Sequence, residues 1–221
     1  PICKVKSLAD MKGRKVAITG AGGSDASVLN EAMKSVGLKY DDVEKIYLGF
    51  PQHAPAFQNG AIDGSITTEP TTTNIQRLGA AVVLTGNDAF YPDAQTATIM
   101  FSGDFAQKRK EVATRFMKAY LRAARDFNDA MVNGKLQGPG ADDIIAILAK
   151  RTVIKSPEVL RNMTMHGVNP DGALNVDSMR KDLAFFKQTG DVASATVAVE
   201  QVLDQSFVTE AAKALGPYVK K

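Results

Sequence analysis

The chain has 221 residues with 27 Lys and Arg against 24 Asp and Glu, a formal net charge of +3. Hydrophobic residues make up 44% and charged residues 23%, a globular composition that excludes intrinsic disorder, and the single cysteine excludes an internal disulfide or a thiolate metal cluster. The positive charges are scattered among acids, so nucleic-acid binding is not expected, and no apolar run reaches the ~18–20 residues of a membrane span.

The first element of the chain is a short apolar run at residues 15–19, whose β-branched bias predicts a buried strand. Glycines at 20, 22 and 23 end this strand, and Ser24 or Asp25 is expected to cap a helix. Apolar residues fall on one face of that helix, and Gly37 stands where a glycine ends a helix.

Two similar units follow. Residues 43–50 predict a second strand, which turns at Pro51 into a short helix closed by Gly60. A third strand is expected at residues 64–68, followed by a helix around 72–78 and a closing strand at 81–85.

This alternation of strands and helices predicts an α/β fold with a parallel sheet and crossover helices. Ligands of such sheets bind outside the carboxyl ends of the strands. Residues 20–24, 49–53 and 67–71 are therefore expected to lie together on one edge of the sheet.

The second half of the chain is predicted to be nearly all helical. A polar connector at residues 87–95 leads into a further strand at 96–101. A long helix then carries an apolar stripe that we interpret as core, formed by Val112, Phe116, Tyr120, Ala123, Phe127 and Met131. Further helices are expected at residues 142–150, 156–162, 177–189 and 206–215, with Pro157 opening one and Gly190 and Gly216 ending two.

The glycine-rich turn at residues 20–24 is the strongest candidate for a ligand site. It fits neither a Walker A motif nor the dinucleotide fingerprint. It precedes a helix whose N–H groups and positive dipole end suit a carboxylate or a sulfonate, although the Asp25 carboxylate would take the same N–H groups as a cap. The candidate ligand-binding residues of this turn are Gly22, Gly23, Ser24, Asp25 and Ala26.

Four side chains elsewhere are further candidates for ligand contact. His53 follows the second strand and either touches a ligand or is a solvated residue at the start of a helix. Glu69 ends the third strand and either accepts an N–H or hydroxyl of a ligand or forms a salt bridge. Phe50 and Tyr91 offer flat apolar surfaces. A planar or partly cationic solute is slightly favoured over a sulfonate or inorganic anion, because Asp25 would repel an anion.

No catalytic or metal-binding residues are expected. Neither His53 nor His166 has a Cys, Asp or Glu partner at metal-ligand spacing, and the chain lacks a nucleophile turn of the G-x-S-x-G kind. The sequence therefore predicts no cofactor, and it predicts ligand binding without chemistry.

Three stretches of the sequence resemble the substrate-binding proteins of ABC importers, of the nitrate, sulfonate, taurine and thiamine-pyrimidine type. They are VKSLADMKGRKVAITGAGGSDASVLNEAMKSVGL, DVEKIYLGF and AFQNGAIDGSITTEP, and the likeness extends from Val5 to Tyr218. The resemblance implies a two-lobed type II periplasmic-binding-protein fold with mostly parallel sheets and a helical C-terminal part. It also implies a small-molecule solute, a membrane permease and an ATPase as partners, and an extracytoplasmic, periplasmic location.

The same resemblance implies how the chain is divided. Residues 1–11 correspond to a crossover segment, 12–85 to a complete lobe two, 86–95 to a hinge connector, and 96–221 to the returning half of lobe one with the C-terminal helices. The opening strand–helix–strand section of lobe one has no counterpart, so lobe one is expected to be incomplete at its N-terminus.

Some questions stay open at this point. Lipid anchoring is one, because Cys3 does not stand first in the chain and is interpreted as an ordinary free thiol. A ligand-binding sensor module is an alternative function. Another is an enzyme on the same fold, of the pyrimidine or menaquinone biosynthesis type, although the cysteine-rich cluster of fungal pyrimidine synthases is absent from the sequence.

Overall fold

The structure, a computed structural model, describes residues 5–221, and Cys3 lies outside the described residues. The chain divides into two compact units. Unit 1 runs to Ala97 and takes in Asn175–Gln201, and unit 2 comprises Thr98–Leu174 and Val202–Lys221. The segment Asn175–Gln201 thus belongs with the N-terminal unit, whereas the sequence grouped it with the C-terminal helices. The lobe boundaries stay a prediction.

Unit 1 is built on a parallel sheet of three strands in the order β2-β1-β3. The strands are β1 (Lys15–Ile18), β2 (Glu44–Tyr47) and β3 (Gly64–Ser65), each followed by a helix, as the sequence predicted. The helices are α1 (Ser24–Ser35), α2 (Phe50–Gln58), α3 (Thr71–Arg77) and, from the later segment, α8 (Val176–Thr189). Gly37 has a φ of +74°, which matches its expected place at the end of α1.

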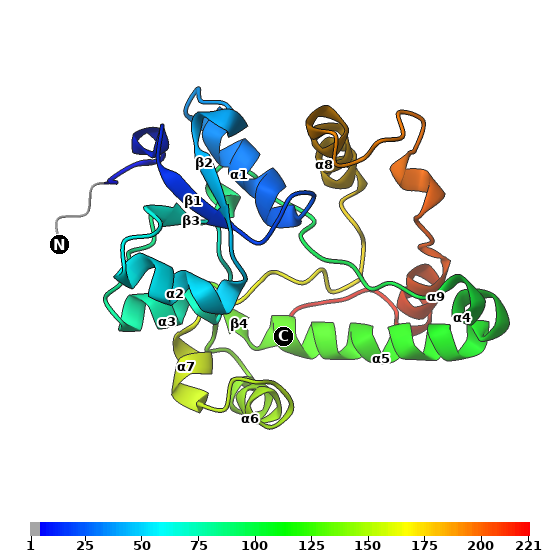
Figure 1. Cartoon of the computed structure of the whole chain (residues 1–221). Coiled ribbons are helices and arrows are strands. Elements are labelled where there is room, and N and C mark those ends of the chain that lie inside the picture. Colours follow the sequence, from blue (N-terminus) through cyan, green and yellow to red (C-terminus); the bar gives the residue numbers. More distant parts are fainter. Residues whose placement is uncertain (1–4) are drawn as a thin grey trace. The chain divides into compact units, whose positions relative to one another are not determined.

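Helices lie on both faces of this sheet (Figure 1), and alternating side chains of β1 pack into the clusters on the two faces. Val16 and Ile18 lie in a core with Leu29 and Met33 of α1 and Phe185 of α8. On the other face, Ala17 is buried in a second cluster with Ala56 of α2 and Ile62. The sheet is therefore covered on both faces, which explains why β1 is a continuous apolar run.

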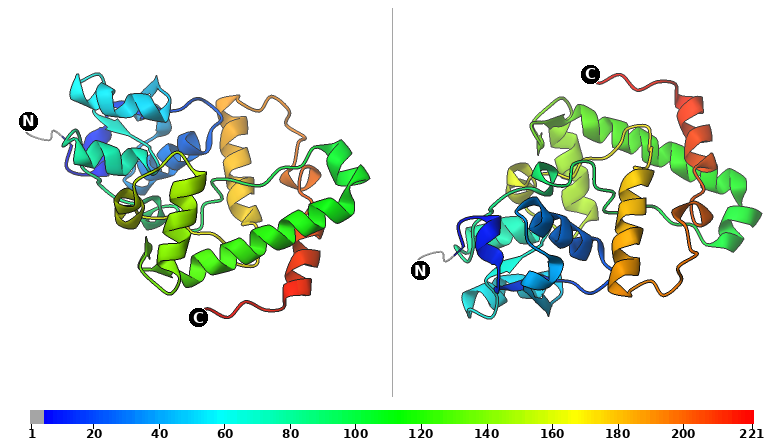
Figure 2. Two further views of the ribbon diagram at one scale, coloured as in Figure 1. Left: turned by 90° about the horizontal axis from the view of Figure 1, so that it is seen from below. Right: turned by 90° about the horizontal axis from the view of Figure 1, so that it is seen from above.

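Unit 2 is mainly helical and contains two apolar clusters. In the first, α4 (Gly103–Lys108) and α5 (Lys110–Asp129) pack with α9 (Ser206–Leu215), which lies beside α5 in all the views (Figure 2). In the second, α6 (Ala141–Arg151) and α7 (Pro157–Asn162) pack on a hairpin of β4 (Met131–Val132) and β5 (Lys135–Leu136).

The sequence located these helices correctly, but it missed the hairpin. Asn133 and Gly134 have φ of +49° and +74°, which suits a two-residue hairpin turn. Pro157 opens α7 as expected, and the positive φ of Gly190 and Gly216 places them at the ends of α8 and α9.

Helix α5 buries a different face from the one expected. Its buried residues include Ala113, Met117 and Leu121, which pack in one apolar cluster with residues of α9. Met131 of the expected stripe lies outside α5, in β4, and the other members are at most partly buried, with Phe116 exposed. The prediction that this stripe is core is therefore wrong: the small side chain of Ala113 allows α9 to approach closely, and the stripe contributes only partly buried side chains, such as Tyr120 and Phe127, to the margins of the apolar clusters.

Two expected strands do not form. Residues 81–85 and 96–101 form neither helix nor strand, and they pair with no strand among residues 5–221. Both strand predictions are therefore wrong: apolar, β-branched composition favours a strand, but a strand requires a neighbour with which to exchange hydrogen bonds.

None of the helices described between residues 5 and 221 is long and apolar enough to cross a membrane.

Candidate functional site

The parallel pairing of the sheet brings the three predicted ligand loops to one edge. β1 pairs in parallel with β2 and with β3, so the chain leaves all three strands on the same side. The loops that follow Ile18, Tyr47 and Ser65 are therefore neighbours at the carboxyl edge of the sheet. This prediction of the sequence is confirmed.

The turn after β1 is shaped by its glycines. Gly22 has a φ of +71°, a conformation that L side chains rarely adopt. Gly23 is the N-cap of α1, one residue before the expected caps, and a Cβ atom at this position would lie 2.6 Å from Oδ1 of Asp25. Only glycine fits here without displacing that carboxylate.

The Asp25 carboxylate turns back into the turn that precedes it. Asp25 is buried, and one of its oxygens accepts a hydrogen bond from the N–H of Thr19, at the end of β1. The other oxygen accepts from the N–H of Ala26 at 3.1 Å. Asp25 therefore fastens the start of α1 to the end of the strand, a cap-like role that the sequence left open.

This arrangement removes one of the expected ligand donors. Ala26 is buried, and its N–H also donates to the carbonyl oxygen of Gly23 at 3.0 Å. Within residues 5–221, no side chain or carbonyl group accepts from the hydroxyl or backbone N–H of Ser24, which is exposed at the first position of the helix. Ser24 and the exposed Gly22 are thus the accessible members of the predicted set.

His53 is fully buried on α2, in contrast to both interpretations of the sequence. Its Nε2 lies 3.0 Å from the carbonyl oxygen of Leu48, and its Nδ1 lies 2.9 Å from the hydroxyl of Ser65. Burial lowers the pKa of His53, although the bond to the Leu48 carbonyl opposes this shift. The neutral ring donates to Leu48 and accepts from Ser65, so it links α2 to the ends of β2 and β3.

Glu69 caps a helix instead of forming a salt bridge. Its carboxylate accepts from both the backbone N–H and the hydroxyl of Thr73, at 2.9 and 3.0 Å. It thereby satisfies a free donor in the first turn of α3. In the same loop, the hydroxyl of Thr67 is the single buried polar side-chain atom of residues 5–221 that has no hydrogen-bond partner.

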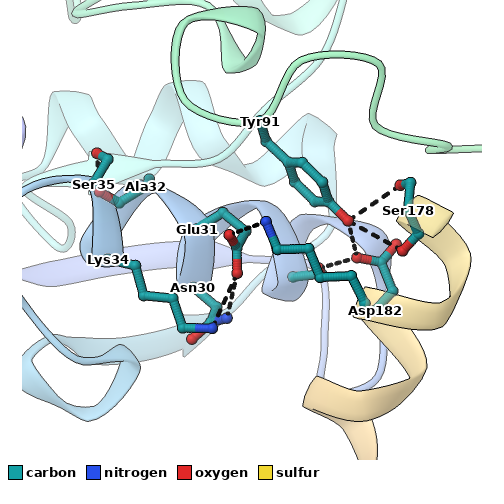
Figure 3. Close-up of polar contacts among 10 residues, drawn as sticks. Asn30, Glu31, Ala32, Lys34, Ser35, Tyr91, Ser178 and Asp182 are labelled. Atoms are coloured by element: carbon teal, nitrogen blue, oxygen red, sulfur yellow. Dashed lines mark hydrogen bonds and ion pairs between the residues drawn. The ribbon is translucent and has the colours of Figure 1, made fainter.

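The two aromatic candidates differ in accessibility. Phe50 begins α2, is partly buried, and packs its ring against His53 with centroids 5.6 Å apart. Tyr91 is only 5% exposed, and its hydroxyl donates to Asp182 at 2.6 Å and lies 3.1 Å from Oγ of Ser178 (Figure 3). Phe50 stays a candidate for ligand contact, whereas the contacts of Tyr91 are structural.

Tyr91 belongs to a polar cluster that holds α1, the connector and α8 together (Figure 3). Asp182 of α8 accepts from Tyr91 and also from the hydroxyl of Ser27, in the first turn of α1. Burial and the hydrogen bond to Asp182 raise the pKa of Tyr91 to about 12. Because Ser27 lies so close to the glycine turn, this cluster fixes the helix end at which a ligand is expected.

Lysine 181 extends the same cluster along α1. Its ammonium group pairs with Glu31 and lies 4.5 Å from the ring centre of Tyr91. Lys34 pairs with Glu31 as well, at 3.1 Å. Burial opposes ionisation of Glu31, but these two lysines outweigh it and lower the pKa of the carboxyl.

Sequence reasoning missed the partners that α8 contributes. A Cβ atom on Gly22 would lie 3.6 Å from Cβ of Asp191, so the residue that follows the C-cap of α8 covers one side of the turn. Ser27 and Asp182 are 155 residues apart in the chain. No local pattern links positions so distant, and co-variation among homologues is the signal that could have found them.

Comparison with known proteins identifies the fold. A ligand-binding component of an ABC-type import system from Staphylococcus aureus matches with a TM-score of 0.76 at 18% identity, over 94% of this chain and 68% of that one. The periplasmic aliphatic sulphonate binding protein of Escherichia coli matches with a TM-score of 0.65 at 23% identity, over 92% and 66%. The alkanesulfonate-binding protein of Xanthomonas axonopodis pv. citri, bound to MOPS, matches with a TM-score of 0.62 at 19% identity, over 94% of this chain and 65% of that one.

These structures assign the chain to the periplasmic-binding-protein fold, the class that the sequence indicated. Residues 3–130, more than half of the chain, match the NMT1/THI5-like family, and the chain belongs to that family. A protein of Escherichia coli (strain K12), whose name proposes aliphatic sulfonates as its ligand, is 33% identical over 85 residues, 38% of this chain. The match covers 26% of that relative, and the chain spans about two thirds of the solved structures.

Substitution of Tyr91 by Phe is expected to destabilise the protein. It removes the hydroxyl that Asp182 and Ser178 contact in a buried cluster. Asp182 keeps its hydrogen bond from Ser27, but the loss of a hydrogen bond to a charged group costs about 1.5–3 kcal/mol in the free energy of unfolding, measured by urea denaturation. The matched control is Tyr47→Phe at a tyrosine that is 56% exposed, which is expected to change little. Equal effects at the two positions would contradict the structural role of Tyr91.

Stability is expected to fall with pH through His53. The pKa of His53 in the folded state lies below its value of about 6.5 in the unfolded state. As pH falls below about 6.5, the unfolded chain binds a proton that the folded chain does not, and the free energy of unfolding decreases by at most about 1.4 kcal/mol per pH unit. Urea denaturation between pH 7.5 and 5.5 should show a smaller decrease in His53→Gln than in the unsubstituted protein.

The control for this measurement is His166→Gln, at the exposed histidine of unit 2. It removes one histidine and leaves the buried imidazole of His53 in place. If His53→Gln shows the same pH dependence as His166→Gln, the neutral buried imidazole is not its source.

Proposed function

We propose that this chain acts as the solute-binding component of an ABC importer and binds its solute without converting it. The observation that carries the proposal is the carboxyl edge of the unit 1 sheet. An accessible helix N-terminus at Ser24 follows β1 there, and Thr67, whose hydroxyl has no partner among residues 5–221, follows β3. A buried polar atom without a partner is rare in folded proteins, and a bound solute would supply one.

The comparisons support the same proposal. The family and the fold are those of the relatives described above, whose names include import components and sulfonate-binding proteins. A membrane permease and an ATPase are the partners that this function requires, and an extracytoplasmic location follows from it. These assignments are proposals for the whole protein, because the chain spans only part of its relatives.

For the ligand, we propose a small organic solute with an anionic head group, such as a sulfonate. The sequence favoured a planar or partly cationic solute because of the charge of Asp25. In the structure that carboxylate accepts hydrogen bonds from the N–H groups of Thr19 and Ala26 and therefore points into the glycine-rich turn. The exposed N–H and hydroxyl of Ser24 then supply donors at the positive end of α1, which supports an anion.

The function is tested by incubating the protein with taurine, nitrate, alkanesulfonates, pyrimidines and aromatic acids in turn. A cognate solute at a hundred times its Kd should stabilise the folded state by about 2.7 kcal/mol, seen as a rise in Tm, and mass spectrometry should recover it unchanged. Recovery of a converted product would show an enzyme and contradict the proposal.

The variant Thr67→Val tests whether the hydroxyl of Thr67 contacts the solute. The hydroxyl has no partner within the described residues, so its replacement by a methyl group should leave the Tm without solute unchanged or higher and weaken solute binding about tenfold. Thr73→Val is the matched control, because that hydroxyl donates to Glu69 and its loss should lower the Tm instead. Unchanged affinity in Thr67→Val would remove Thr67 from the site.

The head-group proposal makes a separate prediction for Asp25→Asn. A carboxylate about 4 Å from a bound anion, at an effective dielectric constant near 20, would repel it by roughly 4 kcal/mol, or about a thousandfold in affinity. If the Asp25 carboxylate only stabilises the turn through its hydrogen bonds, its replacement should change the Kd for an alkanesulfonate by less than tenfold. The free energy of unfolding should fall by about 1–3 kcal/mol. Isothermal calorimetry and urea denaturation measure the two effects. A gain in affinity of a hundredfold or more would show that Asp25 faces the ligand.

A further inference from the structure

The sequence contains two Asn-Gly dipeptides, Asn59-Gly60 and Asn133-Gly134. An asparagine followed by glycine is open to spontaneous deamidation, because glycine has no side chain that keeps its backbone nitrogen away from the neighbouring amide. The two dipeptides have the same composition, but the structure gives them different hydrogen bonds.

Deamidation of asparagine needs neither an enzyme nor an oxidant. The backbone nitrogen of the glycine loses its proton and forms a bond to Cγ of the asparagine, while the C–N bond of the side-chain amide breaks and ammonia leaves with that proton. Water then opens the cyclic imide at one of its two C–N bonds. The product is aspartate or isoaspartate, in which the backbone continues through the side chain. A reactive site therefore requires an accessible amide and a glycine N–H that is not engaged elsewhere.

The first requirement and the second are both met at Asn133 and Gly134, the two-residue loop between β4 and β5. Asn133 is exposed, and among residues 5–221 its side chain makes no hydrogen bond. The N–H of Gly134 likewise donates to no group in the part of the chain that the structure describes. The hairpin has only two residue pairs, so a small local opening gives the loop the freedom that the reaction needs.

The same two groups are engaged in hydrogen bonds at Asn59-Gly60. Asn59 is the C-cap of α2, and its Oδ1 accepts from the N–H of Ala61 at 3.0 Å. The N–H of Gly60 donates to the carbonyl oxygen of Phe57 at 3.2 Å. Asn59 is as accessible a residue as Asn133, because both are exposed. Hydrogen bonding therefore distinguishes the two dipeptides, and exposure does not.

We propose that Asn133 is a site of spontaneous deamidation in the folded protein, and that the hydrogen bonds at the end of α2 protect Asn59. The modified residue lies in unit 2, outside the candidate ligand site. The inference therefore depends neither on the solute nor on the proposed function.

The two products affect the hairpin differently. Aspartate followed by glycine suits a two-residue hairpin turn as well as asparagine does, so this product adds a negative charge and keeps the turn. Isoaspartate lengthens the backbone of the loop by one methylene group and displaces Gly134, whose carbonyl oxygen accepts from the N–H of Met165 at 2.8 Å. The isoaspartate form should therefore have a lower Tm than the Asn133→Asp variant.

Peptide mapping by mass spectrometry tests the proposal on the chain incubated at pH 8 and 37 °C, folded in one sample and unfolded in urea in the other. In urea the two dipeptides should react at rates that agree within about fivefold, because only the local sequence acts. In the folded sample the reaction of Asn133 should slow by less than about tenfold, whereas that of Asn59 should slow by about a hundredfold or more.

A pair of variants assigns the charge change to one position. Each deamidation converts a neutral amide into a carboxylate, so an acidic form of the chain accumulates and separates by ion exchange. Asn133→Gly removes the amide and keeps the turn, because glycine readily adopts the positive φ of this position, and it should abolish most of the acidic form. Asn59→Gly is the matched control and should leave the rate of its accumulation unchanged.

Three results would overturn the proposal. The first is conversion of Asn59 in the folded chain as fast as that of Asn133. The second is an acidic form that accumulates as fast in Asn133→Gly as in the unsubstituted chain. The third is an unreacted Asn133 in the folded chain after a time in which the chain in urea has reacted completely.

Discussion

Parallel pairing of β1 with both of its neighbours is the constraint on which the candidate site depends. Because β1 runs in the same direction as β2 and β3, the turn that precedes α1, the start of α2 and the loop that contains Thr67 all leave the sheet at one edge. The alternation of Val16 and Ile18 with Ala17 then anchors helices on both faces. The loops at this edge are thus held by the apolar core beneath them, and their exposed residues are available for recognition.

The sequence predicted elements well wherever a local signal marks their ends. Gly37, Gly190 and Gly216 each have a positive φ at the end of a helix, and Pro157 opens α7. These signals depend on the conformation of one or two residues, so no knowledge of the rest of the fold is required. The same logic located the strand–turn–helix unit around Gly22.

The sequence was less reliable where the outcome depends on distant partners. The composition of residues 81–85 favours a strand, but the pairing that makes a strand comes from another segment of chain. The face that α5 buries is chosen by α9, which packs on Ala113 and Met117 and leaves Phe116 exposed. Likewise, a buried role for Tyr91 follows from Ser178 and Asp182, some ninety residues later in the chain. Local pattern carries no information about these choices.

Most of the polar side chains at the carboxyl edge form hydrogen bonds that stabilise the loops to which they belong. Asp25 accepts hydrogen bonds from the N–H groups of Thr19 and Ala26, and Glu69 accepts from the N–H and the hydroxyl of Thr73. His53 forms hydrogen bonds with Leu48 and Ser65. Each of these groups was a candidate ligand contact because its chemistry suits recognition, and the same chemistry suits a turn that must satisfy its own donors and acceptors.

Because these side chains form hydrogen bonds within the fold, the groups left to bind a ligand at this edge are small hydroxyls and backbone N–H groups. The side chains hold those donors in place. Ser24, presented by a helix that Asp25 and Ser27 fasten, and Thr67, whose hydroxyl has no partner within residues 5–221, are of this kind. A rigid set of neutral donors at a helix N-terminus stabilises an anion without a positively charged side chain, because the helix dipole and the oriented N–H groups supply the field. A net charge of +3 spread over the whole chain is therefore compatible with selective binding of an anionic solute.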